Sequence, residues 1–534
     1  MRSVGVPMSM TRRTFSQWSM ALACFSSPWA RALSKAGDVD PVHGTLTVDL
    51  AAPSMPWNRM IFGQFLEHFH RQVYGGVFEP GSPLADRTGF RLDVVEALRE
   101  LKVPIVRWPG GCFVSGYHWQ DGVGKRSPAY NKAWGVEDSN TFGTDEFVQW
   151  CRMIGAEPYI CTNAGTGTAE EMSDWVEYCN LPTQGKYARM RIANGHAEPY
   201  NVRYWSIGNE NYFSTEIGSK TIEEWESLVR TSAQLMRAVD PEIQLLAAAT
   251  VKGDWTARML REAGKALNFI SIHGYWDALW QRNTVPADYP HCVARSAQPE
   301  RQIEQAIALV DDAGFGGRIN IAFDEWNLRG WHHPGFPGGG ANKLDLIRER
   351  DENDRNEVYT MADAVFSASF LHGCLRHAKQ VQMACMAPVV NARGPLFVHP
   401  KGIVRRTTFH VLRMYSDLLQ PNVLANTVAG EDFVVGESSV PVLDAVTSRS
   451  ADGRQVTLAL INRHPSRPAL WKLDVRGSRL PAQCRLTVLS GETPDAFNDV
   501  SNPGRVKPET VTVPLRDDSL VIPAHSVCMA EFSL

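Results

Sequence analysis

Eight short apolar segments alternate with amphipathic stretches of helical period between residues 60 and 391. A strand buried on both faces appears as a continuous apolar run, whereas a covering helix shows apolar residues three and four positions apart. Val94, Leu98 and Leu101 recur at that helical spacing. Strands separated by helices pair in parallel, because each helical crossover returns the chain to the same edge of the sheet. The predicted strands span residues 60–65, 104–108, 157–162, 203–207, 244–248, 269–273, 319–324 and 381–387.

This alternation predicts an α/β protein with a (β/α)8 TIM barrel. We place the barrel at residues 57–404. From residue 405 to residue 534 the apolar segments are short and separated by turn residues, which is typical of an antiparallel β-sandwich. Residues 43–56 open with the alternating sequence HGTLTVDL, so we expect an N-terminal strand that joins this C-terminal β-sandwich.

Residues 1–35 carry the features of an export signal. Arg12 and Arg13 lie in a twin-arginine motif, TRRTFS, which precedes a weakly apolar run. Ala30 and Ala32 then supply a small-x-small cleavage site. We therefore expect a Tat-type signal and export of the protein to the periplasm or the medium. The alternative is an unstructured tail in which two arginines are adjacent by chance.

Charge and hydropathy exclude two classes of partner. The sequence has 54 Lys and Arg against 58 Asp and Glu, a net charge of −4, whereas nucleic-acid binding requires a clustered basic excess. No segment reaches the roughly 18 consecutive apolar residues of a membrane span. We expect neither nucleic acid nor a membrane as a partner.

The ten cysteines form no CxxC motif, so the sequence predicts no metal site.

Two glutamates follow predicted strands at positions where (β/α)8 enzymes carry their active sites, the carboxyl ends of the strands. Glu210 follows the fourth strand and Glu325 follows the seventh. Glycoside hydrolysis requires such a pair, one carboxylic acid to protonate the leaving oxygen and one carboxylate to act as nucleophile. We therefore predict that Glu210 and Glu325 are catalytic. The alternative is a pair of structural carboxylates neutralised by arginine.

Other polar residues at strand ends suit the same chemistry. Asn209 is placed to hydrogen-bond the 2-hydroxyl of a sugar, a contact that strengthens in the transition state. Arg107 and Tyr275 are placed to keep Glu325 ionised, because a nearby cation and a hydrogen-bond donor both favour the carboxylate form. We also expect Trp205 and Trp326 to border Glu210.

Five sequence segments carry a more specific pattern. They are residues 65–68 with 74–76, 107–124 (RWPGGCFVSGYHWQDGVG), 163–180, 205–210 (WSIGNE) and 323–327 (FDEWN). In this order and at these barrel positions, they resemble glycoside hydrolase family 51, the α-L-arabinofuranosidase family. The resemblance extends from about residue 44 to the C-terminus.

The resemblance implies roles for seven residues. It implies that Glu210 is the acid/base and Glu325 the nucleophile. It implies further that the sugar-binding residues are Glu67, Arg107, Cys112, Asn209 and Tyr275, with Arg107 supporting the nucleophile. It implies no cofactor, a carbohydrate substrate, and a homo-oligomer, since relatives are often hexamers.

The expected function is a retaining, exo-acting α-L-arabinofuranosidase that releases terminal L-arabinofuranose from plant-wall arabinan or arabinoxylan through a covalent glycosyl-enzyme. Three positions depart from the family pattern. Cys112 stands where many members have asparagine, although cysteine also occurs there. Pro388 replaces a glutamine that meets the sugar, and Arg329 stands where an aromatic residue lines the leaving-group side. They leave open a related retaining glycosidase, such as an endoglucanase or xylosidase, or a non-catalytic carbohydrate-binding protein. The Gly- and Pro-rich segment 327–356 is a candidate rim of the site.

Overall fold

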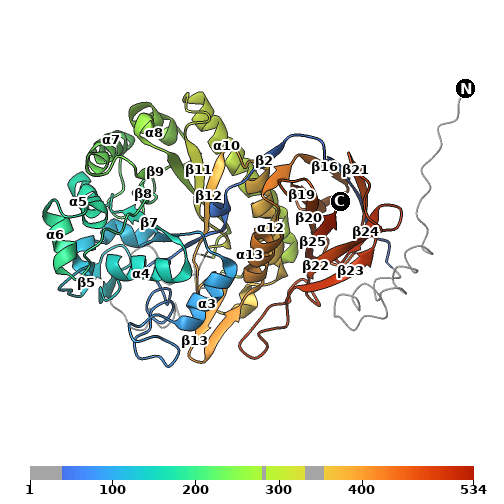
Figure 1. Ribbon diagram of the computed structural model, residues 1–534, viewed down its shortest axis with the longest axis horizontal. Coiled ribbons are helices and arrows are strands. Elements are labelled where there is room, and N and C mark those ends of the chain that lie inside the picture. The colour runs from blue at the N-terminus through green and yellow to red at the C-terminus, as the bar shows by residue number, and fades with distance from the viewer. Residues whose placement is uncertain (1–38, 280–283, 331–353) are drawn as a thin grey trace, which may run out of the picture.

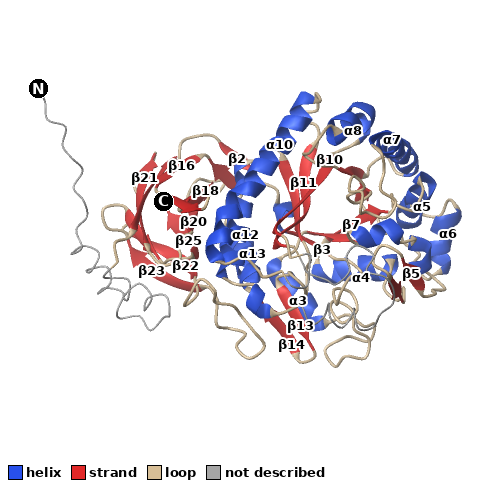
Figure 2. Ribbon diagram, turned by 180° about the vertical axis from the view of Figure 1, so that it is seen from behind, coloured by secondary structure: helices blue, strands red, loops and turns tan. Residues whose placement is uncertain are grey.

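The computed structural model describes residues 39–279, 284–330 and 354–534. The predicted export signal and most of the candidate rim at 327–356 lie outside these ranges. A helix-ringed barrel and a sheet-rich part formed mostly by residues 422–534 stand side by side (Figures 1 and 2). None of the helices described is long and apolar enough to cross a bilayer.

Eight parallel strands close the barrel in the order β10-β11-β12-β3-β4-β7-β8-β9. Each predicted strand contributes one of them, which confirms the (β/α)8 prediction. Nearly all apolar residues of these strands are buried, because helices cover the outside of the barrel and side chains fill its inside. Their bounds are β3 Gly63–Phe65, β4 Ile105–Trp108, β7 Glu157–Thr162, β8 Tyr204–Ile207, β9 Gln244–Ala248, β10 Phe269–Asp277, β11 Asn320–Arg329 and β12 Val381–Met386.

Helices cover the outside of the barrel (Figure 2). Local sequence sets their ends: Thr221 caps one helix by accepting from the backbone N–H of Glu224, whose carboxylate accepts from the backbone N–H of Thr221 in return. The bounds are α3 Leu92–Leu101, α4 Thr144–Ile154, α5 Ala169–Asn180, α6 Lys186–Ala193, α7 Ile222–Val239, α8 Trp255–Ala263, α9 Tyr289–Ala294, α10 Gln298–Asp312, α12 Met361–Arg376 and α13 Thr407–Leu418.

The last barrel helix, α13, lies within the region predicted as β-sandwich. It packs against α12 on one side and α3 on the other, and so closes the ring. The barrel therefore ends at Leu418, and the boundary predicted at residue 404 is one helix too early. The hairpin of β13 (Leu396–His399) and β14 (Gly402–Arg405) precedes α13.

The sheet-rich part consists of a four-stranded sheet, β16-β1-β21-β24, facing a seven-stranded sheet, β2-β15-β19-β20-β25-β22-β23. A second apolar core contains residues of both sheets, among them Leu46, Trp471 and Leu486. Its strands are β1 Val42–Asp49, β2 Ser54–Pro56, β15 Asn422–Leu424, β16 Asn426–Gly430, β19 Leu443–Arg449, β20 Gln455–Asn462, β21 Ala469–Arg476, β22 Gln483–Leu489, β23 Glu509–Pro514, β24 Ser519–Ile522 and β25 Ser526–Ser533. Two further hairpins are β5 Ala129–Asn131 with β6 Val136–Asp138, and β17 Asp432–Val435 with β18 Ser438–Pro441.

The first strand of the described chain pairs with strands that are distant in the sequence. β1 pairs antiparallel with β16 and parallel with β21, and β2 pairs antiparallel with β15. The N-terminal segment therefore belongs to the C-terminal sheets, and the β1–β21 pair makes one of the two sheets mixed rather than purely antiparallel.

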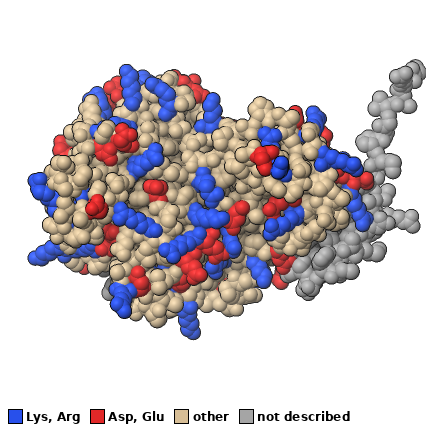
Figure 3. Space-filling view, in the orientation of Figure 1, with Lys and Arg blue, Asp and Glu red and all other residues tan. Residues whose placement is uncertain are grey.

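Helix α12 separates the barrel from these sheets (Figure 1). Every residue from Met361 to Leu375 is buried, because one side packs on β11 and the other on β19, β20 and β25. A helix in such a position is mostly apolar all round, and the few polar side chains of α12, Asp363 among them, are buried as well. All nine described cysteines are free thiols. Acidic and basic side chains are interspersed on the face seen in Figure 3.

Candidate active site

A cavity of about 820 Å³ opens at the carboxyl ends of the barrel strands. Five of the seven predicted site residues line it: Glu67, Cys112, Glu210, Tyr275 and Glu325. The other two, Arg107 and Asn209, are fully buried behind it, where Arg107 Nη2 donates to Asn209 Oδ1 at 2.8 Å. These two side chains support the site from beneath its surface.

Glu210 and Glu325 face each other across this cavity. One carboxylate oxygen of each, together with a ring nitrogen of His273, lie within 4.8 Å of one another. The short turn after β8 aims Glu210 inward, with Gly208 and Glu210 both in the left-handed region at φ 72° and 46°. Such a conformation is strained for a non-glycine residue and is found most often at functional sites.

The surroundings of Glu325 favour its charged form. Arg107 Nη1 donates to Oε2 at 2.9 Å and Tyr275 Oη donates to Oε1 at 2.5 Å. Burial opposes ionisation, but His273, Arg107 and Tyr275 together hold the pKa of Glu325 below its usual value. Glu325 is therefore a carboxylate at neutral pH, the state that a nucleophile requires.

We expect Tyr275→Phe to move the acidic limb of the kcat/KM profile to higher pH by about one unit. The phenol stabilises only the ionised form of Glu325, so its loss raises the pKa of Glu325 and the carboxylate is protonated at a higher pH. A pH series on the purified variant measures the shift. Tyr130→Phe, at an exposed tyrosine, is the control, and an unmoved acidic limb in Tyr275→Phe contradicts the assignment.

His273 is the last residue of the predicted strand 269–273, and the sequence assigns it no role. Its Nδ1 lies 3.0 Å from Glu210 Oε1 and 3.6 Å from Glu325 Oε2, and its Nε2 lies 3.6 Å from Asp324 Oδ1. Burial lowers its pKa, but the three carboxylates outweigh burial and raise the pKa to about 10. His273 is thus an imidazolium between the two catalytic candidates.

The pKa of Glu67 is raised, whereas that of Glu325 is lowered. Its Oε1 accepts from the backbone N–H of Phe113 and from Trp134 Nε1, both at 3.0 Å. Burial and the charge of Glu325 raise the pKa of Glu67 to about 8. A carboxylic acid that stays protonated at neutral pH can both donate and accept hydrogen bonds, which suits a residue that holds sugar hydroxyls.

Two of the cavity residues that the sequence prediction did not name lie beside the predicted site residues. Arg393 Nη2 donates to Tyr275 Oη at 2.9 Å, and its guanidinium lies 4.4 Å from the centre of that ring. Glu216 is the second, a buried carboxyl near Glu210 and Cys112. Arg393 follows β12 and Glu216 follows β8, both in irregular segments. No periodic pattern marks such positions, and no sequence signal could have found them.

Three expectations about the surroundings of the site are wrong. Trp205 and Trp326 do not line the cavity, since they point outward from the barrel and pack against Trp175 and Phe370. Arg329 does not line it either. Its guanidinium is buried, with Nη1 2.6 Å from Asp277 and Nε 3.1 Å from Asp363.

We expect Arg329→Met to lower the free energy of unfolding by about 3–5 kcal/mol, because it leaves the buried carboxylate of Asp363 without a cation and that of Asp277 with Arg295 alone. The KM of the folded enzyme stays unchanged, since Arg329 lies away from the cavity. Denaturant unfolding and steady-state kinetics measure the two effects. Arg476→Met removes an exposed pair with Asp474 and should cost less than about 1 kcal/mol. Equal losses in the two variants would refute the structural role of Arg329.

Within the described ranges, three groups of side chains bring three potential metal-binding atoms together. The first group consists of Glu210, Cys112 and Glu216, and the second of Glu210, His273 and Glu325; both lie in the cavity. The third group consists of Glu300, Glu304 and His377. A protonated His273 offers no lone pair, and burial raises the pKa of the Cys112 thiol well above its usual value. Both cavity groups are therefore suited to hydrogen bonding rather than to holding a metal.

Two family models match this chain. The Alpha-L-arabinofuranosidase 1 domain matches residues 97–287, and the Alpha-L-arabinofuranosidase C-terminal domain matches residues 324–526. Alpha-L-arabinofuranosidase C of Emericella nidulans is 36% identical over 448 residues, which are 78% of this chain and 84% of that protein. The chain belongs to the α-L-arabinofuranosidase family.

Other members of the α-L-arabinofuranosidase family agree over similar lengths. The intracellular exo-alpha-(1->5)-L-arabinofuranosidase of Halalkalibacterium halodurans is 32% identical over 81% of this chain and 87% of its own length. The solved GH51 alpha-L-arabinofuranosidase from Thermotoga petrophila RKU-1 matches with a TM-score of 0.81 at 32% identity, over 91% of this chain and 99% of that one. The resemblance to family 51 found in the sequence is confirmed.

Proposed function

We propose that this protein is an exo-acting, retaining α-L-arabinofuranosidase that releases terminal L-arabinofuranose from plant-wall arabinan or arabinoxylan, or from their oligosaccharides. One observation carries the proposal: two carboxyl groups with oxygens within 4.8 Å face each other across the cavity of a family member. Retaining glycosidases hold their two carboxyl groups about 5–5.5 Å apart, and inverting enzymes hold them farther apart to admit a water.

In the first step Glu325 attacks the anomeric carbon as the glycosidic bond breaks, and Glu210 gives its proton to the leaving oxygen. The sugar is then joined to Glu325 by an ester bond. In the second step Glu210 takes a proton from water, the water oxygen bonds to the anomeric carbon, and Glu325 leaves as a carboxylate. Glu67, Cys112 and Tyr275 hold the furanose at the cavity wall, while Arg107 supports Glu325 from behind and Asn209 in turn positions Arg107.

The test compares an aryl α-L-arabinofuranoside, an aryl β-D-xyloside and a soluble β-glucan, with the arabinofuranoside reaction repeated in dilute methanol. We expect hydrolysis of the arabinofuranoside alone and methyl α-L-arabinofuranoside as the product seen by proton NMR. Hydrolysis of the xyloside or glucan alone would assign another specificity, and no turnover would leave a carbohydrate-binding protein. A β-linked methyl product would disprove retention.

We propose further that the twin-arginine segment directs the protein to the periplasm or the medium. Replacing Arg12 and Arg13 by Lys, followed by fractionation of the cells, tests this, and unchanged export would refute it. We also propose a homo-oligomer, for which the family resemblance is the only support. Light scattering on the purified protein measures its mass, and a mass of one chain would refute the proposal.

A further inference from the structure

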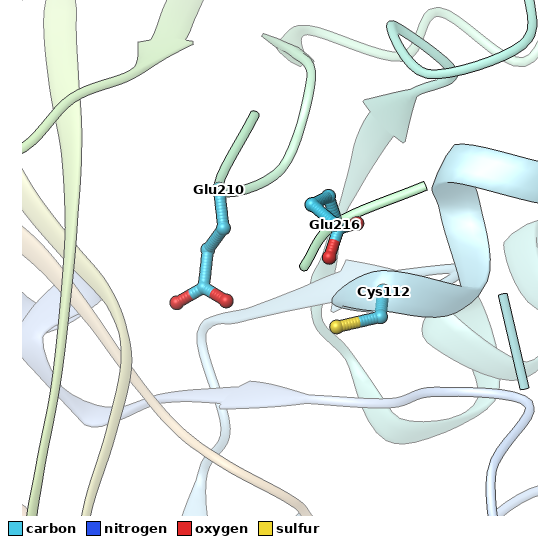
Figure 4. Close-up of side chains that lie close together, drawn as sticks. All are labelled: Cys112, Glu210 and Glu216. Carbon is cyan, nitrogen blue, oxygen red and sulfur yellow. The ribbon is translucent and has the colours of Figure 1, made fainter. Parts of the chain in front are cut away.

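Glu216 places a third carboxyl group beside the proposed acid/base. It follows Glu210 in the loop after β8, and Glu210, Glu216 and Cys112 lie close together (Figure 4). One carboxylate oxygen of Glu210, one of Glu216 and the sulfur of Cys112 all lie within 4.8 Å of one another. Glu216 is only 6% exposed, and Ser115 Oγ donates to its Oε1 at 2.6 Å.

Glu216 also differs from most buried carboxyl groups of this protein in its charge environment. In the portion of the chain that the structure describes, no Lys, Arg or His forms an ion pair with Glu216, although the chain pairs most of its other buried carboxylates. Burial, together with the charge of Glu210 when Glu210 is ionised, outweighs the hydrogen bonds from Ser115, Cys112 and Asn209 and raises the pKa of Glu216 to about 7. The group is therefore neutral in mildly acidic solution and negatively charged in mildly basic solution.

Glu210 lies between two opposing influences. The His273 imidazolium, 3.0 Å away, attracts a negative charge on Glu210. A negative charge on Glu216 repels one on Glu210, because the two carboxyl groups lie close together. The other titratable or charged groups that line the cavity are Glu67, Cys112, Tyr212, Lys252, Tyr275, Arg301, Glu325 and Arg393.

We infer that Glu216 is a positioning residue that holds the proton on Glu210: the negative charge of Glu216 keeps the acid/base protonated as the solution becomes alkaline. This inference rests on the proposed function. It adds that Glu216 offsets the electrostatic effect of His273 on Glu210. Burial keeps Cys112, Tyr212 and Tyr275 in their neutral forms through this range, since it raises the pKa of each well above its usual value. Glu67 also titrates here, but it is unchanged in a Glu216 variant.

The experiment records kcat/KM against pH for wild type and Glu216→Gln with two substrates. An arabinofuranosyl oligosaccharide has a poor leaving group and needs the proton of Glu210, whereas a dinitrophenyl arabinofuranoside does not. We expect the oligosaccharide profiles to coincide below about pH 6, where Glu216 is neutral, and the alkaline limb of the variant to fall about one pH unit lower. With the dinitrophenyl substrate the two proteins should have the same profile.

Glu304→Gln is the matched control, because Glu304 is exposed on α10 and does not line the cavity. If Glu216 were merely structural, its loss would lower both substrates' rates at every pH. That result, or an unmoved alkaline limb, overturns the inference. If Glu216→Gln fails to fold, Ser115→Ala provides the same readout with a smaller shift, because loss of the hydroxyl donor makes Glu216 ionise at higher pH. A wild type that cleaves neither substrate refutes the proposed function instead.

Discussion

Glu325→Ala lowers the turnover of every arabinofuranoside by at least about 10⁴-fold, whatever its leaving group. The change removes the group that forms the covalent bond and the negative charge beside the developing cation at the anomeric carbon. The fold should survive, because Arg107 keeps a second carboxylate, Asp324, at 3.3 Å. Steady-state kinetics measure the loss, and circular dichroism checks the fold.

Sodium azide sharpens this test. In Glu325→Ala the small anion fits the vacated space and attacks an activated substrate from the same side as the missing carboxylate, so the product is the β-glycosyl azide, with inverted configuration. Glu304→Ala, at the exposed glutamate on α10, keeps wild-type activity. Near wild-type turnover in Glu325→Ala, or an azide product of retained configuration, contradicts the assignment of Glu325.

Glu210→Ala gives the second-largest effect, and the effect depends on the leaving group. With an oligosaccharide, kcat/KM falls by about 10³-fold, because an alkoxide cannot leave without a proton. With a dinitrophenyl arabinofuranoside, kcat/KM changes little, but kcat falls by about 10²-fold or more because no base activates the water of the second step.

The covalent glycosyl-enzyme therefore accumulates in Glu210→Ala and produces a burst of phenolate in stopped-flow measurements. Azide should restore kcat with the activated substrate and give the α-glycosyl azide, since it replaces water on the face that Glu210 serves. Loss of kcat/KM by the same factor for both substrates would show that Glu210 is not the acid of the first step.

The barrel could be predicted because its strands are buried on both faces and appear in the sequence as uninterrupted apolar runs. Helix α13 could have been predicted too, because its sequence has a helical period. Val411, Met414 and Tyr415 are buried, whereas Arg413 and Asp417, four positions apart, share an exposed face. The predicted boundary at residue 404 instead followed the last barrel strand and left this helix in the next domain.

The site could be predicted only where chemistry coincides with a strand end. Glu325 on β11 and Glu210 directly after β8 meet that condition. Glu216 and Arg393 do not, because the loops that carry them take their shape from contacts with distant segments. Arg329 shows the opposite error. It shares a strand with Glu325, but its partners Asp277 and Asp363 come from β10 and α12, and only the folded chain brings them together.

The most direct test of the catalytic pair is to trap the glycosyl-enzyme. Glu210→Ala is mixed with dinitrophenyl α-L-arabinofuranoside, quenched in acid, digested with pepsin and analysed by mass spectrometry. If Glu325 is the nucleophile, the peptide that contains Glu325 carries one added pentosyl group, and fragmentation places it on that side chain. A pentosyl group on Glu67 or Glu216, or hydrolysis with no labelled peptide at any time point, would contradict it.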